Sequence, residues 1–399
     1  GGRGHPLLRG RMEQPTPFQV NVPDEVLDDL QRRLRHARLP DAGGQPESHE
    51  GIDPRYLAEL VDYWLNRFDW RACERAINRM PQFRARVAGV QIHFVHRRGR
   101  GPRPLPLMLT HGWPGSFLEM EKILPLLTDP ADHGGSADDA FDVVAPSLPG
   151  FGFSELPPSG LDAFQIADIW RELMVGLGYE RFGVQGGDFG ASINTALGLR
   201  HPSSLVGIHL NYIPGSLTPY LGPGAAPLSE RERAFQADAA AWYETSGAYA
   251  HVQRTRPWTL ASALEDSPAG LAAWIVEKFV EWGDCGDHVE TRFSKDELLS
   301  NVMLYWVTRS VYTASRMYGA MRRHPLALGA GDFIDVPTGI ARLPREAPFP
   351  PREWIERAYR VVYWSDLPSG GHFAAMEEPE RLAHDIRAFF RPLRRDGSR

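Results

Sequence analysis

The sequence is poor in cysteine and has no long apolar run, and each shortage excludes a class of protein. Two cysteines, Cys73 and Cys285, occur among 399 residues and form neither a disulfide framework nor a zinc-binding spacing, which favours a reducing cytoplasm. No stretch approaches the roughly 18 consecutive apolar residues of a membrane span, so no membrane partner is expected. With 44 basic and 50 acidic side chains, the net charge of −6 excludes a strongly basic nucleic-acid-binding protein.

The remaining composition is typical of a soluble globular chain. Hydrophobic residues make up 42% and charged residues 24%, which argues against global disorder. Three of the 44 basic residues are lysine and the others arginine, and with 34 prolines and 39 glycines this usage points to a GC-rich bacterial genome. Composition leaves the oligomeric state open, a homodimer being one option.

Short apolar runs alternate with helical periodicity over much of the chain. The runs that predict strands lie at 105–110, 141–145, 181–185, 205–210, 336–341 and 360–364. Alternation of this kind predicts an α/β fold with a mostly parallel sheet covered by helices on both faces. We also expect one strand from Arg86 to His96 and one helix from Ser116 to Leu127.

The pattern divides the chain into four parts. Residues 1–14, rich in glycine and arginine, lack the apolar segment of a signal peptide and are expected to be a disordered leader or an expression remnant. Residues 15–99 form a mainly helical N-terminal extension. The α/β core comprises 100–213 and 326–399. Between them, 214–325 has helical periodicity without clear strands, which is typical of a cap over a site at the strand ends.

The segment Gly186-Gly187-Asp188-Phe189-Gly190 follows a predicted strand and precedes a helix. Small residues on both sides of a reactive side chain in that context are typical of a nucleophile elbow, a sharp turn that exposes the side chain above the sheet. Asp188 occupies the position of the nucleophile. The alternative is that Asp188 only caps the following helix, a common use of aspartate.

Two other segments belong to the same pattern. His111-Gly112-Trp113-Pro114-Gly115 follows the first core strand, where hydrolases of this fold place one oxyanion-hole N–H; the other N–H would come from Phe189. His372 follows the last strand, which matches the chain order nucleophile, acid, histidine. The candidates for the acid are Asp332, Asp335, Glu346 and Asp366. Glu346 lies in a loop just after a strand, but spacing leaves Asp335 open.

These motifs resemble the microsomal-type epoxide hydrolases, including their juvenile hormone branch and soluble bacterial relatives. The resemblance runs from about Pro17 to Pro392 and includes the N-terminal segment as well as the three catalytic signatures. It implies an α/β-hydrolase fold with a helical cap and a wrapping N-terminal region. The membrane anchor of the mammalian members is not in this sequence, so a soluble enzyme is expected.

The resemblance also implies individual roles. Tyr249, in Ser246-Gly247-Ala248-Tyr249, and Tyr318, in Ser315-Arg316-Met317-Tyr318, match the two tyrosines that bind the epoxide oxygen. Leu343-Pro344-Arg345-Glu346 matches the place of the catalytic acid, which favours Glu346 over Asp335. Phe189 stands where tryptophan is common in this group; its backbone N–H is still available, although the pocket then has a different shape.

An epoxide explains why aspartate replaces serine at the elbow. A serine that opened the ring would form a stable ether, whereas a carboxylate forms an ester that water can cleave. In this mechanism the two tyrosines donate to the leaving oxygen, and His372 activates water to attack the Asp188 ester. Glu346 orients the histidine, and the N–H groups of Trp113 and Phe189 bind the oxyanion. No metal or organic cofactor is needed.

Three alternatives use the same motifs differently. A haloalkane or haloacid dehalogenase shares the aspartate, histidine and acid, but it needs halide donors that the ring of Phe189 cannot supply. A serine esterase is excluded by Asp188, and a non-catalytic binding protein would not need an intact triad. The aromatic cap suggests a bulky apolar or aryl epoxide, used either in detoxification or in making a secondary metabolite.

Overall fold

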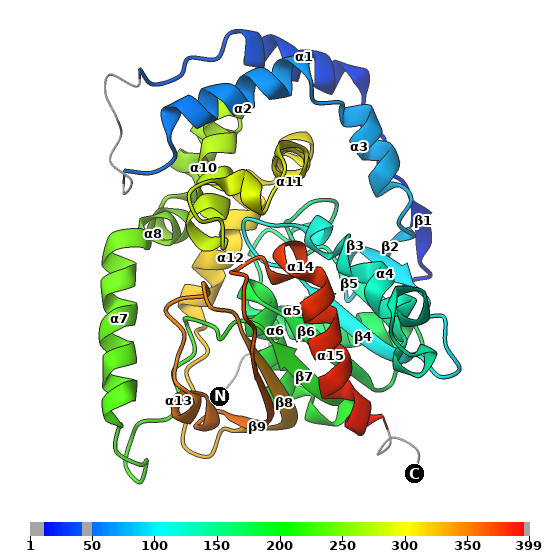
Figure 1. Ribbon diagram of the computed structural model, residues 1–399, viewed down its shortest axis with the longest axis vertical. Coiled ribbons are helices and arrows are strands. Elements are labelled where there is room, and N and C mark those ends of the chain that lie inside the picture. The colour runs from blue at the N-terminus through cyan, green and yellow to red at the C-terminus, as the bar shows by residue number, and fades with distance from the viewer. Residues whose placement is uncertain (1–11, 42–49, 395–399) are drawn as a thin grey trace.

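The computed structural model describes residues 12–41 and 50–394, and within them nine strands form one mixed sheet (Figure 1). Its order is β1-β2-β3-β5-β4-β6-β7-β8-β9. The strands are β1 Thr16–Phe18, β2 Gln82–Val87, β3 Val90–Arg97, β4 Leu105–Thr110, β5 Phe141–Pro146, β6 Phe182–Gly186, β7 Leu205–Leu210, β8 Ile334–Arg342 and β9 Tyr359–Asp366. The pairs from β5 to β9 are parallel, and β1, β2 and β3 add to the β5 edge in antiparallel fashion.

Helices cover the parallel part of the sheet, which confirms the predicted α/β architecture. The helices of the core are α4 Ile123–Thr128, α5 Ala163–Gly176, α6 Asp188–Arg200, α13 Arg352–Glu356, α14 Ala374–Glu377 and α15 Pro379–Leu393. Helices α5 and α6 pack on each other, while α15 packs with α4 and lies in front of the sheet in Figure 1. Parallel strands ending at one edge bring the loops after β4, β6 and β8 together.

Helices alone connect β7 to β8, apart from one short bridge between Thr218 and Ala327 within this described stretch. They are α7 Glu230–Ser246, α8 Ala248–Thr255, α9 Pro257–Leu264, α10 Pro268–Trp282, α11 Lys295–Thr308 and α12 Val311–Arg323. We call them the inserted helices. In Figure 1 they stand beside one end of the sheet, with α7 along the flank of the molecule.

The N-terminal region packs on the inserted helices. It contains α1 Asp24–Arg35, α2 Pro54–Asn66 and α3 Trp70–Ile77, and α1 and α2 lie across α10 and α11 in Figure 1. The hydroxyl of Tyr63 donates to Asp296 at 2.8 Å, and Lys295 pairs with Glu59 at 2.8 Å. These two polar contacts lie at the surface, while Trp64 of α2 is 1% exposed and belongs to the hydrophobic core, so the region is anchored by apolar packing as well.

Two predicted elements are wrong. The expected strand Arg86–His96 is a hairpin of β2 and β3, because Ala88 and Gly89 adopt positive φ angles of 49° and 85° and turn the chain. The expected helix Ser116–Leu127 is a 3-10 turn, η1 Phe117–Met120, followed by α4. Pro125 explains the break, since it has no N–H for the carbonyl of Glu121 and its ring would clash there.

The predicted leader lies partly outside the described residues, which begin at Met12. Met12 packs against the core, close to Gly176, and the N–H of Glu13 donates to the carbonyl of Arg86 at 2.9 Å. These last leader residues are therefore attached to the fold. Within 12–41 and 50–394, no helix combines the length and the apolar character needed to cross a bilayer.

Candidate active site

Asp188 begins α6 immediately after β6, in a strained turn. Its φ is +48°, a left-handed conformation that is uncommon for a residue with a side chain. The turn is tight: a Cβ at Gly190 would lie 2.1 Å from the carbonyl oxygen of Thr110, so glycine is required there. Gly187 is the N-cap residue of α6 and Asp188 the first residue inside it, which contradicts the simple capping alternative.

The two oxygens of Asp188 have different partners. Oδ1 accepts the N–H of Trp113 at 2.9 Å and the N–H of Phe189 at 2.8 Å. Oδ2 lies 3.0 Å from Nε2 of His372. The backbone N–H groups of Trp113 and Phe189, predicted from the sequence as oxyanion-hole donors, thus converge on one oxygen. Two converging donors are suited to stabilise negative charge on that oxygen.

His372 bridges two carboxylates. Its Nδ1 lies 2.8 and 3.0 Å from the oxygens of Glu346, while Nε2 faces Asp188. Burial alone would lower the pKa of His372, but the charges and hydrogen bonds of Glu346 and Asp188 outweigh it and hold the pKa well above its usual value. The imidazole between the two acids therefore holds its proton more strongly than a free histidine.

The other candidate acids lie elsewhere. Asp335 has a side chain that is 76% exposed and pairs with Arg360 at 3.4 Å. Asp366 pairs with Arg342, and Asp332 accepts the N–H of Gly329. Of the four, Glu346 is the one that contacts His372, which favours it as the orienting acid.

The two predicted tyrosines lie on neighbouring inserted helices and share one aromatic cluster. Tyr249 in α8 stacks on Trp113 with ring centroids 5.2 Å apart and an angle of 7°. Tyr318 in α12 meets Tyr249 edge to face at 6.0 Å and Phe189 at 4.9 Å. Burial, and then the charge of Asp188, raises the pKa of Tyr249 well above its usual value; burial does the same for Tyr318. Both phenols are therefore neutral hydrogen-bond donors.

A cavity of ≈ 660 Å³ opens between the sheet and the inserted helices. Asp188, His372 and Tyr249 line it, together with the aromatic side chains Phe235, Trp242, Tyr243 and Trp354. Tyr318 does not line this cavity, but its ring packs edge to face against that of Tyr249, which does. A cavity of this size accepts a drug-sized molecule, and its walls combine aromatic rings with polar side chains such as Gln236 and Arg345.

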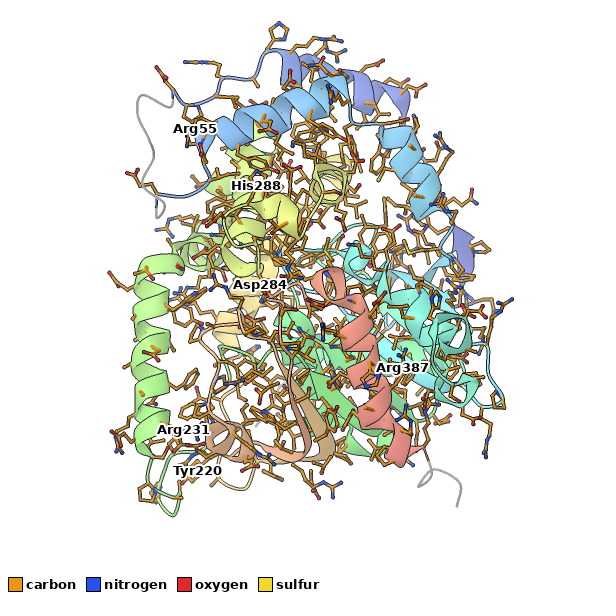
Figure 2. All side chains as sticks on the ribbon, viewed as in Figure 1. Arg55, Tyr220, Arg231, Asp284, His288 and Arg387 are labelled. Atoms are coloured by element: carbon orange, nitrogen blue, oxygen red, sulfur yellow. The ribbon has the colours of Figure 1, made fainter. Side chains whose placement is uncertain are left out.

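Several residues of this site were not predicted. The ring of Tyr212 lies 5.6 Å from that of His372, and the ammonium of Lys278 lies 4.7 Å from the centre of the Tyr249 ring. Asp284, labelled in Figure 2 between the inserted helices and the C-terminal part of the chain, accepts the N–H of Gly370 at 2.9 Å. Lys278 is one of only three lysines in the sequence. Its rarity sets it apart, but no sequence motif around it indicates a position near the active site.

Comparisons with known proteins place this geometry in a family. Residues 15–120 match the model described as the epoxide hydrolase N terminus, and residues 106–271 match that of the alpha/beta hydrolase fold. A chain from Stigmatella aurantiaca is 43% identical over 384 residues, covering 95% of this chain and 85% of that one. Epoxide hydrolase 1 of Sus scrofa is 39% identical over 407 residues, covering 94% and 88%.

The chain belongs to the epoxide hydrolase family. Its fold agrees with that of a solved family member: the Aspergillus niger epoxide hydrolase superposes with a TM-score of 0.81 at 32% identity, covering 96% of this chain and 97% of that one. The resemblance, the hydrolase fold and the enzyme class predicted from sequence are thereby confirmed. The α/β-hydrolase body supplies Asp188 and His372 in this family member, and the inserted helices supply the tyrosines.

Proposed function

We propose that this chain converts a bulky apolar or aryl epoxide to a vicinal diol through an ester on Asp188. The observation that carries the proposal is the difference between the two oxygens of that side chain. Oδ1 already accepts two N–H bonds, so it is suited to become the ester carbonyl, with its oxyanion site in place. Oδ2 is left as the nucleophile that attacks an epoxide carbon from the large cavity.

Ring opening requires a proton donor opposite the nucleophile. Tyr249 and Tyr318 fit this role because their rings pack against that of Trp113, whose backbone N–H donates to Asp188. Their raised pKa also keeps both phenols protonated. Each phenol can donate to the oxygen as the C–O bond breaks. The new bond joins Oδ2 to carbon, the epoxide oxygen becomes a hydroxyl, and the site takes up one proton in total.

Hydrolysis of the ester then depends on His372. Esterification removes the negative charge of Asp188, one of the two charges that raise the pKa of His372, so the imidazole can lose its proton. Neutral His372 then takes a proton from water, while Glu346 holds the tautomer and stabilises the cation that re-forms. The proton that the imidazolium loses after ring opening balances the one that ring opening took up, so the cycle gains and loses no net proton.

The large cavity supports the proposed substrate class. Its aromatic walls and ≈ 660 Å³ volume favour an apolar or aryl epoxide over a small polar one. Water is the second reactant. A cytoplasmic location, and a role in detoxification or in secondary metabolism, remain predictions from the sequence.

Trapping the ester tests this proposal. We expect His372→Gln to be alkylated by styrene oxide and to keep the adduct, visible as a mass increase of one substrate on the peptide that contains Asp188. Asp188→Asn is the matched control and should acquire no adduct. An inactive His372→Gln protein that stays unmodified would contradict the ester mechanism. A panel of styrene, stilbene, terpenoid and fused-aryl epoxides, with chiral analysis of the diols, would then define the substrate.

A further inference from the structure

A second, much smaller cavity lies against Asp188 and His372. It encloses ≈ 20 Å³, enough for one water molecule and too little for an epoxide substrate. Gly112, Glu119 and Asn211 contribute to its walls. Because Asp188 and His372 line the large cavity as well, the nucleophile and the base stand between a space for substrate and a space for water.

Glu119 is the acidic residue in this small cavity that the ester mechanism does not use. It belongs to the 3-10 turn Phe117–Met120, and its carboxyl faces the N–H of Gly112, in the loop that carries Trp113. A Cβ at Gly115 would lie 1.9 Å from Oε2 of Glu119, so the carboxyl occupies space that any other residue at 115 would need. Glycine at position 115 therefore makes room for the carboxyl of Glu119, in addition to any effect on loop flexibility.

The carboxyl of Glu119 has spare hydrogen-bonding capacity. Among the described residues, its hydrogen-bond partner is the N–H of Gly112, at a long 3.5 Å from Oε2. Burial, opposed by the charge of His372 and assisted by that of Asp188, raises the pKa of Glu119 to about 8. A carboxyl in this state can both donate to and accept from a water molecule.

Glu119 also borders a third cavity, of ≈ 370 Å³, between α3, η1 and α11. Polar side chains such as Ser300, Asn301 and Asp296 line it. Among the described residues, Glu119 is the one that lines both this cavity and the small one. Water held by Glu119 is thus next to a second space, which shares no lining residue with the substrate cavity.

We infer that Glu119 positions the water molecule that hydrolyses the Asp188 ester, holding it in the small cavity within reach of His372. The inference rests on the ester mechanism proposed above. One proton of the water passes to Nε2 of His372, and the water oxygen bonds to the carboxyl carbon of Asp188. The bond from that carbon to Oδ2, the oxygen that joins Asp188 to the substrate, then breaks, and Oδ2 leaves with the product. The acid proton left on Asp188 passes to the departing alkoxide, and His372 keeps the proton that it took.

A purely structural role for Glu119 makes a different prediction. If its carboxyl only supported the loop at Gly112, its loss would displace the N–H of Trp113, which serves both ring opening and hydrolysis. A water-positioning residue affects hydrolysis alone. Separate rate constants for the two steps therefore distinguish the roles.

The test is single-turnover kinetics of Glu119→Gln with styrene oxide. Acid-quenched samples analysed by mass give the rates at which the ester forms and disappears. We expect ester formation within about 3-fold of wild type and hydrolysis slower by about 10- to 100-fold, the usual effect of losing a hydrogen bond to a reacting group. Only folded protein forms the ester, so the hydrolysis rate refers to folded molecules even if the variant is less stable.

Glu121→Gln is the matched control, because Glu121 lies two residues away and lines only the third cavity; both rates should stay at the wild-type level. Unchanged hydrolysis in Glu119→Gln would overturn the inference and leave the ester mechanism intact. Equal losses in both steps, or no ester in this variant, would assign Glu119 a structural role and overturn it too. If wild-type enzyme forms no ester at all, the proposed function itself fails.

Discussion

The aromatic cluster makes Tyr249→Phe an informative substitution, because it removes one hydroxyl and leaves the ring. The ring contributes the stacking on Trp113 at 5.2 Å, and phenylalanine retains that contact. The variant should therefore fold and bind substrate normally. What it loses is one of two donors to the oxygen that becomes negatively charged as the epoxide opens.

The expected size of the effect follows from the enclosed position of that hydroxyl. A hydrogen bond to a charged oxygen contributes about 1.5–3 kcal/mol, which corresponds to about 10- to 100-fold in rate. Tyr318 remains as a donor, so we expect ester formation slower by about 10- to 100-fold rather than abolished. Hydrolysis of the ester, in which the tyrosines take no part, should change by less than about 3-fold.

Stopped-flow tryptophan fluorescence is a suitable assay, since Trp113 and Trp282 lie beside Tyr249. Because the pKa of Tyr249 is raised well above its usual value by burial, ester formation by wild-type enzyme should show no loss from tyrosine ionisation below about pH 10. Tyr249→Phe with wild-type ester formation, or with loss confined to hydrolysis, would refute the assignment of this phenol as a donor.

Three further substitutions have defined outcomes. Glu346→Gln removes a charge that raises the pKa of His372. The pH below which protonation of His372 slows hydrolysis should therefore decrease, while the maximal hydrolysis rate falls at least about 10-fold. An unchanged pH dependence of the hydrolysis rate would count against the pairing of Glu346 with His372. Asp284→Asn weakens the hydrogen bond to the N–H of Gly370 and should lower the free energy of unfolding in urea by about 1–3 kcal/mol, with a loss below 0.5 kcal/mol as the contrary result. Phe189→Leu keeps the backbone N–H and should retain ester formation within about 10-fold, with altered enantiomer preference on chiral chromatography; complete loss would mean that the ring itself is needed.

The sequence predicts the body of the fold well because its strands are buried on both faces. Short continuous apolar runs such as Leu105 to Thr110 stand out against polar surroundings, and the structure begins and ends β4 at those residues. The hairpin at Ala88-Gly89 and the break before α4 depend on single residues within an otherwise periodic pattern. Periodicity averages over such residues, so it merges elements that a local turn separates.

The site was predictable where chemistry lies in a short motif and unpredictable where it depends on distant packing. Asp188 and His372 follow strands in a fixed order, and the structure brings them to 3.0 Å. Spacing leaves Asp335 open beside Glu346; in the structure Asp335 lies exposed within β8, whereas the loop after β8 brings Glu346 to His372. Glu119 gave no signal at all, because its position depends on the missing side chain at Gly115.

The central claim, an ester on Asp188, is tested most directly by one turnover in water enriched in heavy oxygen. With enzyme in excess over epoxide, the first diol should carry an ordinary oxygen atom donated by Asp188, while the solvent label enters the carboxylate. A second turnover by the same protein should then release the label into the diol. Solvent label found fully in the first diol would mean direct attack by water and would contradict the ester mechanism.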